Sequence, residues 1–91
     1  MTPVCAAAFN GREAALRLLL GAGANPNTVN DSGNTPMCAA AYNGQEATLK
    51  VLLEHGADAD KKNSIGKSPL DYAKEENEAG CVALLERHGA K

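Results

Sequence analysis

The chain is poor in aromatic residues and carries little net charge. It contains one Phe, two Tyr and no Trp, although 44% of its 91 residues are apolar. A core of small aliphatic side chains suits closely spaced helices better than the facing sheets of a β-sandwich. The formal net charge of −2 argues against a general DNA- or RNA-binding protein, which usually presents a basic face.

Long apolar runs and a secretory leader are absent as well. No stretch approaches the roughly 20 apolar residues that a helix needs to span a bilayer. The first residues also lack a basic segment followed by an apolar run. We therefore expect no membrane association and a location in the cytoplasm or nucleus. The length allows one small domain.

The sequence does contain an internal repeat of 33 residues. Thr2-Pro3 recurs as Thr35-Pro36 and again as Ser68-Pro69. Aligning residues 2–33 with residues 35–66 gives 17 identities in 32 pairs without a gap, which is too many for chance. A fixed period of this length is typical of repeat architectures, in which each unit buries its apolar face against its neighbours.

The local sequence within one period predicts two helices and a loop. Thr35 is suited to cap a helix and Pro36 to occupy its first position, so we predict a first helix that starts at Pro36 and continues through the Ala-rich residues 37–43. Leucines at helical spacing predict a second helix over residues 46–54. A polar loop then leads to the next repeat. The single domain, residues 1–91, divides into repeats at 1–29, 30–62 and 63–91.

Residues 35–40 (Thr-Pro-Met-Cys-Ala-Ala) and residues 51–58 (Val-Leu-Leu-Glu-His-Gly-Ala-Asp) resemble the ankyrin repeat. The resemblance covers essentially the whole chain in three copies that stay in register. It implies an all-α ankyrin-repeat solenoid of stacked helix-turn-helix units joined by β-hairpin-like loops. It also implies a protein–protein interaction module within a larger intracellular protein, which binds its partner through a concave surface and is not an enzyme.

The sequence departs from the family pattern in two places. The usual histidine of the first helix is replaced by Cys5, Cys38 and Asp71, so we expect the hydrogen bonds between neighbouring loops to differ. In the third repeat, the polar residues 74–78 replace the Ala-aromatic-Asn-Gly segment of the first two repeats, and such a polar face is typical of a terminal capping repeat. The first repeat has no such polar face, and self-association through it is an alternative function that the sequence leaves open.

No pattern in the sequence supports a cofactor or a metal site, and a reactive cysteine is the one enzymatic alternative. The three cysteines lack the spacing of a zinc site. Cys5 and Cys38, one repeat apart, should be too distant for a disulfide. We expect all three thiols to be buried and unpaired, in keeping with a reducing compartment. His55 and His88 each precede a Gly that ends a second helix, where a His can bind the last carbonyls.

The resemblance places the partner-binding surface at the loop tips and at the ends of the first helices. Aromatic residues are favoured interface anchors, although Phe9 and Tyr42 have the alternative of packing over the turn between the two helices. Ile65 is apolar where polar residues are the norm. The resemblance also makes Asn27 a candidate for asparagine hydroxylation. The predicted concave surface consists of Phe9, Asn10, Asp31, Ser32, Asn34, Tyr42, Asn43, Ser64, Ile65, Lys67, Glu75 and Glu76.

Overall fold

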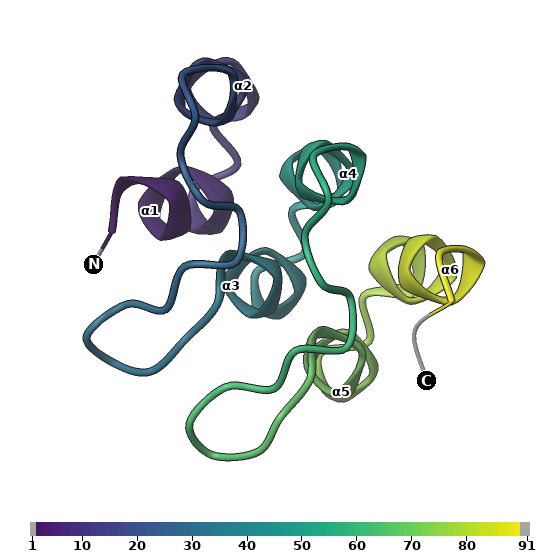
Figure 1. Ribbon diagram of the computed structural model, residues 1–91. Helices are drawn as coiled ribbons and strands as arrows, with labels where there is room; N and C mark the ends of the chain where they lie inside the picture. The colour runs from purple at the N-terminus through teal and green to yellow at the C-terminus, as the bar shows by residue number, and fades with distance from the viewer. Residues whose placement is uncertain (1, 90–91) are drawn as a thin grey trace.

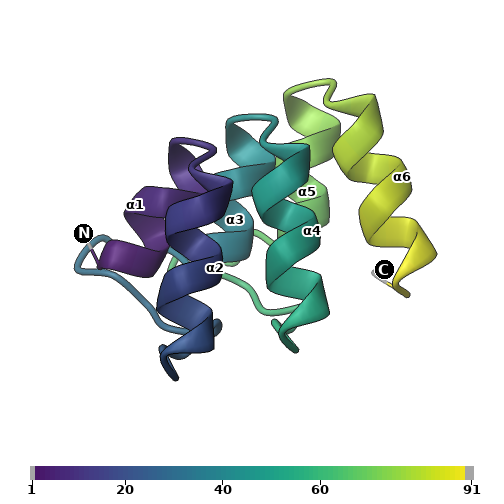
Figure 2. The same ribbon diagram turned by 90° about the horizontal axis from the view of Figure 1, so that it is seen from above.

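The computed structural model describes residues 2–89 of the chain. This part contains six α-helices and no β-strand, and the helices form three successive pairs (Figure 1). The two helices of a pair are joined by a short turn, and the pairs stack side by side (Figure 2). This arrangement agrees with the predicted all-α solenoid. The helices are α1 (Pro3–Phe9), α2 (Glu13–Gly21), α3 (Pro36–Tyr42), α4 (Glu46–Glu54), α5 (Pro69–Glu75) and α6 (Ala79–Arg87).

The helices form two layers. The first helices α1, α3 and α5 pack against one another in one layer, while α2, α4 and α6 form the second (Figure 1). The two long loops, between α2 and α3 and between α4 and α5, project from the first layer and away from the second (Figure 1). The loops and the first helices therefore share one side of the molecule.

Each first helix begins at a hydroxyl cap followed by proline, as the sequence predicts. Thr35 Oγ1 accepts a hydrogen bond from Cys38 N at 3.1 Å, and Pro36 occupies the first turn. The helix spans Pro36–Tyr42, so it starts at the predicted Pro36 and ends one residue before the predicted Asn43. It ends early because Asn43 already has a non-helical backbone and closes the end with its N–H. The second helix, Glu46–Glu54, has the predicted bounds.

Small residues allow the first helices to approach closely. Ala7, Ala40 and Ala73 stand at equivalent positions of α1, α3 and α5, and all three are buried in one apolar core. Leu49 of α4 and Leu85 of α6 are fully buried on the second-helix side of the same core. The repeats therefore share one continuous core, as expected of stacked units that cannot bury their apolar faces alone.

The long loops end in turns that resemble the tip of a hairpin. Asn30 N donates to Asn34 O at 2.9 Å, and Asn63 N donates to Lys67 O at the same distance. Gly66 has a φ of 80°, in the left-handed region that favours glycine. Within the same turns, Gly33 N donates to Asn30 O at 2.9 Å and Gly66 N donates to Asn63 O at 3.0 Å. Because these backbone bonds stay inside each turn, residues 2–89 contain no strand, although the loops were predicted to be hairpin-like.

Candidate protein-binding surface

Four of the predicted binding residues lie at the exposed tips of the two long loops. Asp31 and Ser32 belong to the loop before α3, and Ser64 and Ile65 to the loop before α5. The two tips are joined, because Ser64 Oγ donates to Ser32 O at 3.4 Å. The Ile65 side chain is 70% exposed. The structure thus places an apolar side chain in solvent on a tip that is tied to its neighbour.

Tyr42 lies beside a residue that the sequence did not assign to this surface. The rings of Tyr42 and Tyr72 pack edge to face, with centroids 5.6 Å apart and planes 88° apart. Tyr42 is still 49% exposed. The Tyr42 ring therefore packs against a ring of the next first helix and also presents surface to solvent.

Lys67 and Glu75 form an ion pair beside the same ring. Lys67 Nζ lies 2.6 Å from Glu75 Oε1 and 5.4 Å from the centroid of Tyr72. The hydrogen bond to Glu75 raises the pKa of Lys67 above its ordinary value. The two charges largely compensate each other locally, so this part of the surface presents aromatic and amide groups more than net charge.

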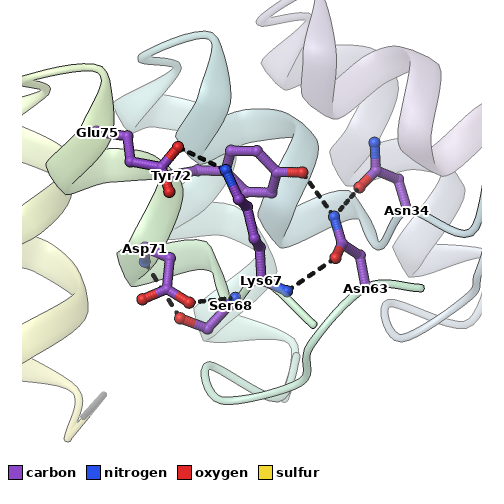
Figure 3. A network of polar contacts seen from close by, with 7 residues as sticks. All are labelled: Asn34, Asn63, Lys67, Ser68, Asp71, Tyr72 and Glu75. Carbon is purple, nitrogen blue, oxygen red and sulfur yellow. Dashed lines mark hydrogen bonds and ion pairs between the residues drawn. The ribbon is translucent and has the colours of Figure 1, made fainter. Parts of the chain in front are cut away.

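Asn63 connects the two long loops to α5 (Figure 3). Its Nδ2 donates to Tyr72 OH at 2.7 Å and to Asn34 Oδ1 at 2.9 Å. Its Oδ1 accepts from Lys67 N at 3.0 Å and from Ile65 N at 3.2 Å. The Asn63 side chain thus joins its own turn to the previous loop and to the following helix. These contacts fix the relative positions of the loop tips and α5.

The amides at the ends of the first helices serve the chain itself. Asn10 Nδ2 donates to Ala6 O at 3.0 Å within α1, and Asn43 Nδ2 donates to Phe9 O at 2.8 Å across to the neighbouring repeat. Phe9 is half-buried, whereas Glu76, the C-cap residue that follows α5, is exposed. Of the helix-end residues predicted to bind a partner, Asn43 has the clearest structural role, because it joins two repeats.

The cysteines take over contacts between first helices and loops. Cys5 Sγ lies 3.7 Å from Asn34 O, and Cys38 Sγ lies 3.5 Å from Lys67 O, each as a thiol donor. All three thiols are unpaired and buried, as predicted. Burial raises the pKa of Cys5 and Cys38, and it raises that of Cys81 to about 11. Buried thiols that are protonated at neutral pH are poor nucleophiles.

His55 and Asn27 also have structural roles. His55 Nδ1 lies 2.9 Å from Val51 O, which confirms the predicted contact with the last carbonyls of a second helix. Asn27 Oδ1 accepts from Asp58 N at 2.7 Å and so links the starts of two loops. No group of three His, Cys, Asp or Glu residues in this part of the chain could hold a metal ion. None of its helices combines the length and apolar character needed to cross a membrane.

Comparison with known proteins places this arrangement in a family. The family model described as ankyrin repeats matches residues 4–91 with three copies. The chain belongs to the ankyrin-repeat family. Ankyrin repeats are generally protein–protein interaction modules and are typically not enzymes. The predicted family and the predicted all-α repeat solenoid are therefore confirmed.

A solved ankyrin-repeat structure is closely similar to the whole chain. The crystal structure of the human ASB11 ankyrin repeat domain shares 35% sequence identity with it, at a TM-score of 0.93. The match covers 100% of this chain and 41% of that one, so the chain spans less than half the length of its structural relative. A search of curated proteins gave no match.

Sequence reasoning missed three residues of this ankyrin surface. Asn30 and Asn63 recur one repeat apart, and the recurrence alone could have indicated that their side chains hold the loop turns. Tyr72 could have been found from the repeat register, because Ala6 and Ala39 occupy its equivalent positions. An aromatic ring where the other repeats have alanine must lie over the first helices on the loop side.

Proposed function

We propose that this ankyrin array is a protein-binding module that holds its partner on the predicted concave surface. The supporting observation is the placement of exposed apolar side chains. Residues 2–89 leave four large apolar side chains exposed, and three of them, Val29, Tyr42 and Ile65, belong to a long loop or to the end of a first helix. Exposed apolar groups gathered on one side of a protein are typical of an interaction site.

The hydrogen bonds of the two long loops should lower the conformational entropy that these exposed side chains lose when a partner binds. Asn63 holds the second loop turn, and Ser64 N donates to Gly33 O at 2.9 Å between the loop tips. Side chains on a surface that is already ordered lose less entropy when a partner binds. Aromatic and aliphatic anchors on such a surface commonly supply most of the binding energy.

The state of the cysteines supports an intracellular, reducing location for the module. Cys5, Cys38 and Cys81 are all free, and none contributes to a stabilising cross-link. Small domains of oxidising compartments commonly depend on disulfides. We therefore place the module in the cytoplasm or nucleus, as a part of a larger protein.

Self-association through repeat 1 is the second candidate, and one observation favours it. Leu18 of α2 is 76% exposed, whereas Val51 at the equivalent position of α4 is fully buried against its neighbours. The face of repeat 1 that carries Leu18 therefore has the residues of a stacking face and is open to solvent. A second copy of the chain would cover such a face in a homo-oligomer.

Two variants distinguish the candidates and serve as controls for each other. Tyr42→Ala combined with Ile65→Asp alters the loop side, and Leu18→Asp alters the open face of repeat 1. Affinity purification from extracts of the cells that produce the protein should lose partners with the double variant and keep them with Leu18→Asp. Retention of every partner by the double variant would contradict the proposed surface.

Sedimentation velocity over a range of concentrations tests the second candidate directly. Self-association through repeat 1 predicts an apparent mass that rises with concentration and a return to monomer in Leu18→Asp. A monomer at every concentration would exclude it.

A further inference from the structure

The three aromatic residues of the chain line one open hollow beside α3. The hollow has a volume of about 250 Å³ and is lined by Phe9, Asn30, Asn34, Ala39, Tyr42 and Tyr72. Sites that hold a drug-sized molecule measure roughly 300–1,000 Å³. The hollow is therefore of a size to receive a single side chain of a partner.

The repeat register shows what a ligand of this hollow should look like. Moving each lining residue forward by 33 positions converts Phe9 to Tyr42, Asn30 to Asn63, and Ala39 to Tyr72. Tyr42 and Asn63 are the groups that contact the Tyr72 ring, by an edge-to-face packing and by a hydrogen bond to its hydroxyl. Repeat 3 thus places a phenol ring where repeat 2 has alanine.

The other walls of the hollow correspond as well. Asn34 has the position of Lys67, whose ammonium lies over the Tyr72 ring, and Tyr42 has the position of Glu75, which binds that ammonium. The ion pair beside the Tyr72 ring is replaced in the hollow by two neutral side chains. The hollow contains no carboxylate that would attract a cation and no cation that would attract an anion.

Asn30 lines the hollow at the position that Asn63 has in the next repeat. Only 7% of its surface is exposed, and its Oδ1 accepts from Ser32 N at 3.0 Å and Asn34 N at 2.9 Å. These two donors fix Oδ1 as the oxygen, so Nδ2 is the remaining group. Asn63 Nδ2 binds Tyr72 OH, whereas the residue equivalent to Tyr72 in repeat 2 is Ala39, which offers Asn30 Nδ2 no side-chain acceptor.

We infer that the hollow over Ala39 receives a tyrosine side chain from the partner protein. The phenol ring would pack edge to face against Phe9, as Tyr72 packs against Tyr42, and its oxygen would accept from Asn30 Nδ2. A phenylalanine or leucine would fill the same volume but would leave the amide without a partner. This inference rests on the proposed function, since it names the side chain that the concave surface binds.

The test uses p-cresol, the tyrosine side chain alone, with toluene as the analogue that lacks the oxygen. In NMR titrations of the full chain, p-cresol should shift the side-chain amide signals of Asn30 with a dissociation constant on the order of millimolar. Toluene should bind about two- to twelvefold more weakly, which is the contribution of one neutral hydrogen bond. Absence of saturable shifts with p-cresol, or equal affinity for toluene, would overturn the inference.

Two variants locate the site. Ala39→Tyr supplies the ring from within the chain, as Tyr72 does in repeat 3, and should abolish p-cresol binding in a protein that remains folded. Ala6→Tyr is the matched control, because a ring at that position would lie on the side of α1 away from the hollow and should leave binding unchanged. Phe9→Leu keeps an apolar side chain but removes the ring from the hollow, and should weaken binding severalfold, which keeps the test decisive if Ala39→Tyr does not fold.

The result separates this inference from the proposed function. The titration needs no partner, so it can fail while the double variant at Tyr42 and Ile65 still loses partners. That combination would retain the concave surface as the binding site and reject tyrosine as its ligand. Binding of p-cresol that persists in folded Ala39→Tyr would place the ligand elsewhere and reject the assigned hollow.

Discussion

Helices α2 and α4 have the same length and stand one repeat apart, yet they are buried to different extents. Leu16 and Leu49 are fully buried at one equivalent position. Two residues further along each helix, Leu18 is 76% exposed, whereas the equivalent Val51 is fully buried. Helix α4 packs between α2 and α6, whereas α2 packs against α4 alone among the second helices of residues 2–89.

The comparison shows that burial in this array depends on neighbours more than on the residues of a helix. Helix α2 carries three consecutive leucines at positions 18–20, so it is at least as apolar as the better-buried α4. In a stack of repeats, each interface contributes its own share of the stability, and a helix with one neighbour lacks one share. The same side chain should therefore contribute more to the free energy of unfolding in a helix with two neighbours than in a helix with one.

The sharpest test truncates the same leucine in both helices. Leu52 of α4 is fully buried and Leu19 of α2 is partly exposed. Leu52→Ala should lower the free energy of unfolding by about 3 kcal/mol, within the usual range for a buried leucine, and Leu19→Ala by about 1 kcal/mol. Urea unfolding followed by circular dichroism measures both. Equal losses would mean that α2 is supported as fully as α4.

A smaller effect should come from Thr48, a buried residue whose hydroxyl joins repeat 2 to repeat 1. Thr48 Oγ1 of α4 donates to Ala8 O at 3.0 Å, and the side chain is fully buried. Thr48→Val keeps the shape and removes the hydrogen bond, so we expect a loss of about 1 kcal/mol in the same measurement. The control compares Ala15→Thr with Ala15→Val at the equivalent exposed position of α2, and these two variants should differ by less than about 0.5 kcal/mol. A difference between them as large as the loss in Thr48→Val would show that helix propensity, and not the contact with repeat 1, is responsible.

Much of the fold could be predicted because it depends on local sequence. Thr35 and Pro36 mark the start of a helix by hydrogen-bonding capacity and backbone geometry alone, and the 33-residue period gives the order of the units. The burial of the cysteines followed from their position in the period. The predicted end of the first helix was one residue too late, because one or two hydrogen bonds decide where a helix ends.

The candidate surface was harder to predict because its contacts join different repeats. Asn43 was predicted to face a partner, and its amide binds Phe9 O of the preceding repeat. The contact between Tyr42 and Tyr72 pairs residues 30 positions apart that are not equivalent in the period. Side-chain contacts of this kind depend on the stacking distance and on rotamers, which the repeat pattern does not contain. The list of binding residues therefore remains a prediction.

The smallest predicted effect lies at the other end of the array, where α5 has a cap that the other first helices lack. Ser68 and Asp71 bind each other's backbone N–H groups at 3.1 and 3.0 Å. The hydrogen bond from Ser68 N lowers the pKa of Asp71. Asp71→Asn keeps an acceptor but removes the charge at the helix start, so it should cost about 0.5 kcal/mol at pH 7.

The pH dependence gives this last prediction its sign. Because the pKa of Asp71 is lowered on folding, the carboxylate stabilises the folded state above its unfolded value of about 3.9 and loses that contribution as the pH falls through the folded value. The gap in unfolding free energy between the wild type and Asp71→Asn should therefore narrow below about pH 3.9 and then close. Asp31→Asn, which changes an exposed loop tip, should show no gap at any pH. A gap that persists in acid would assign the effect of Asp71 to its shape and not to its charge.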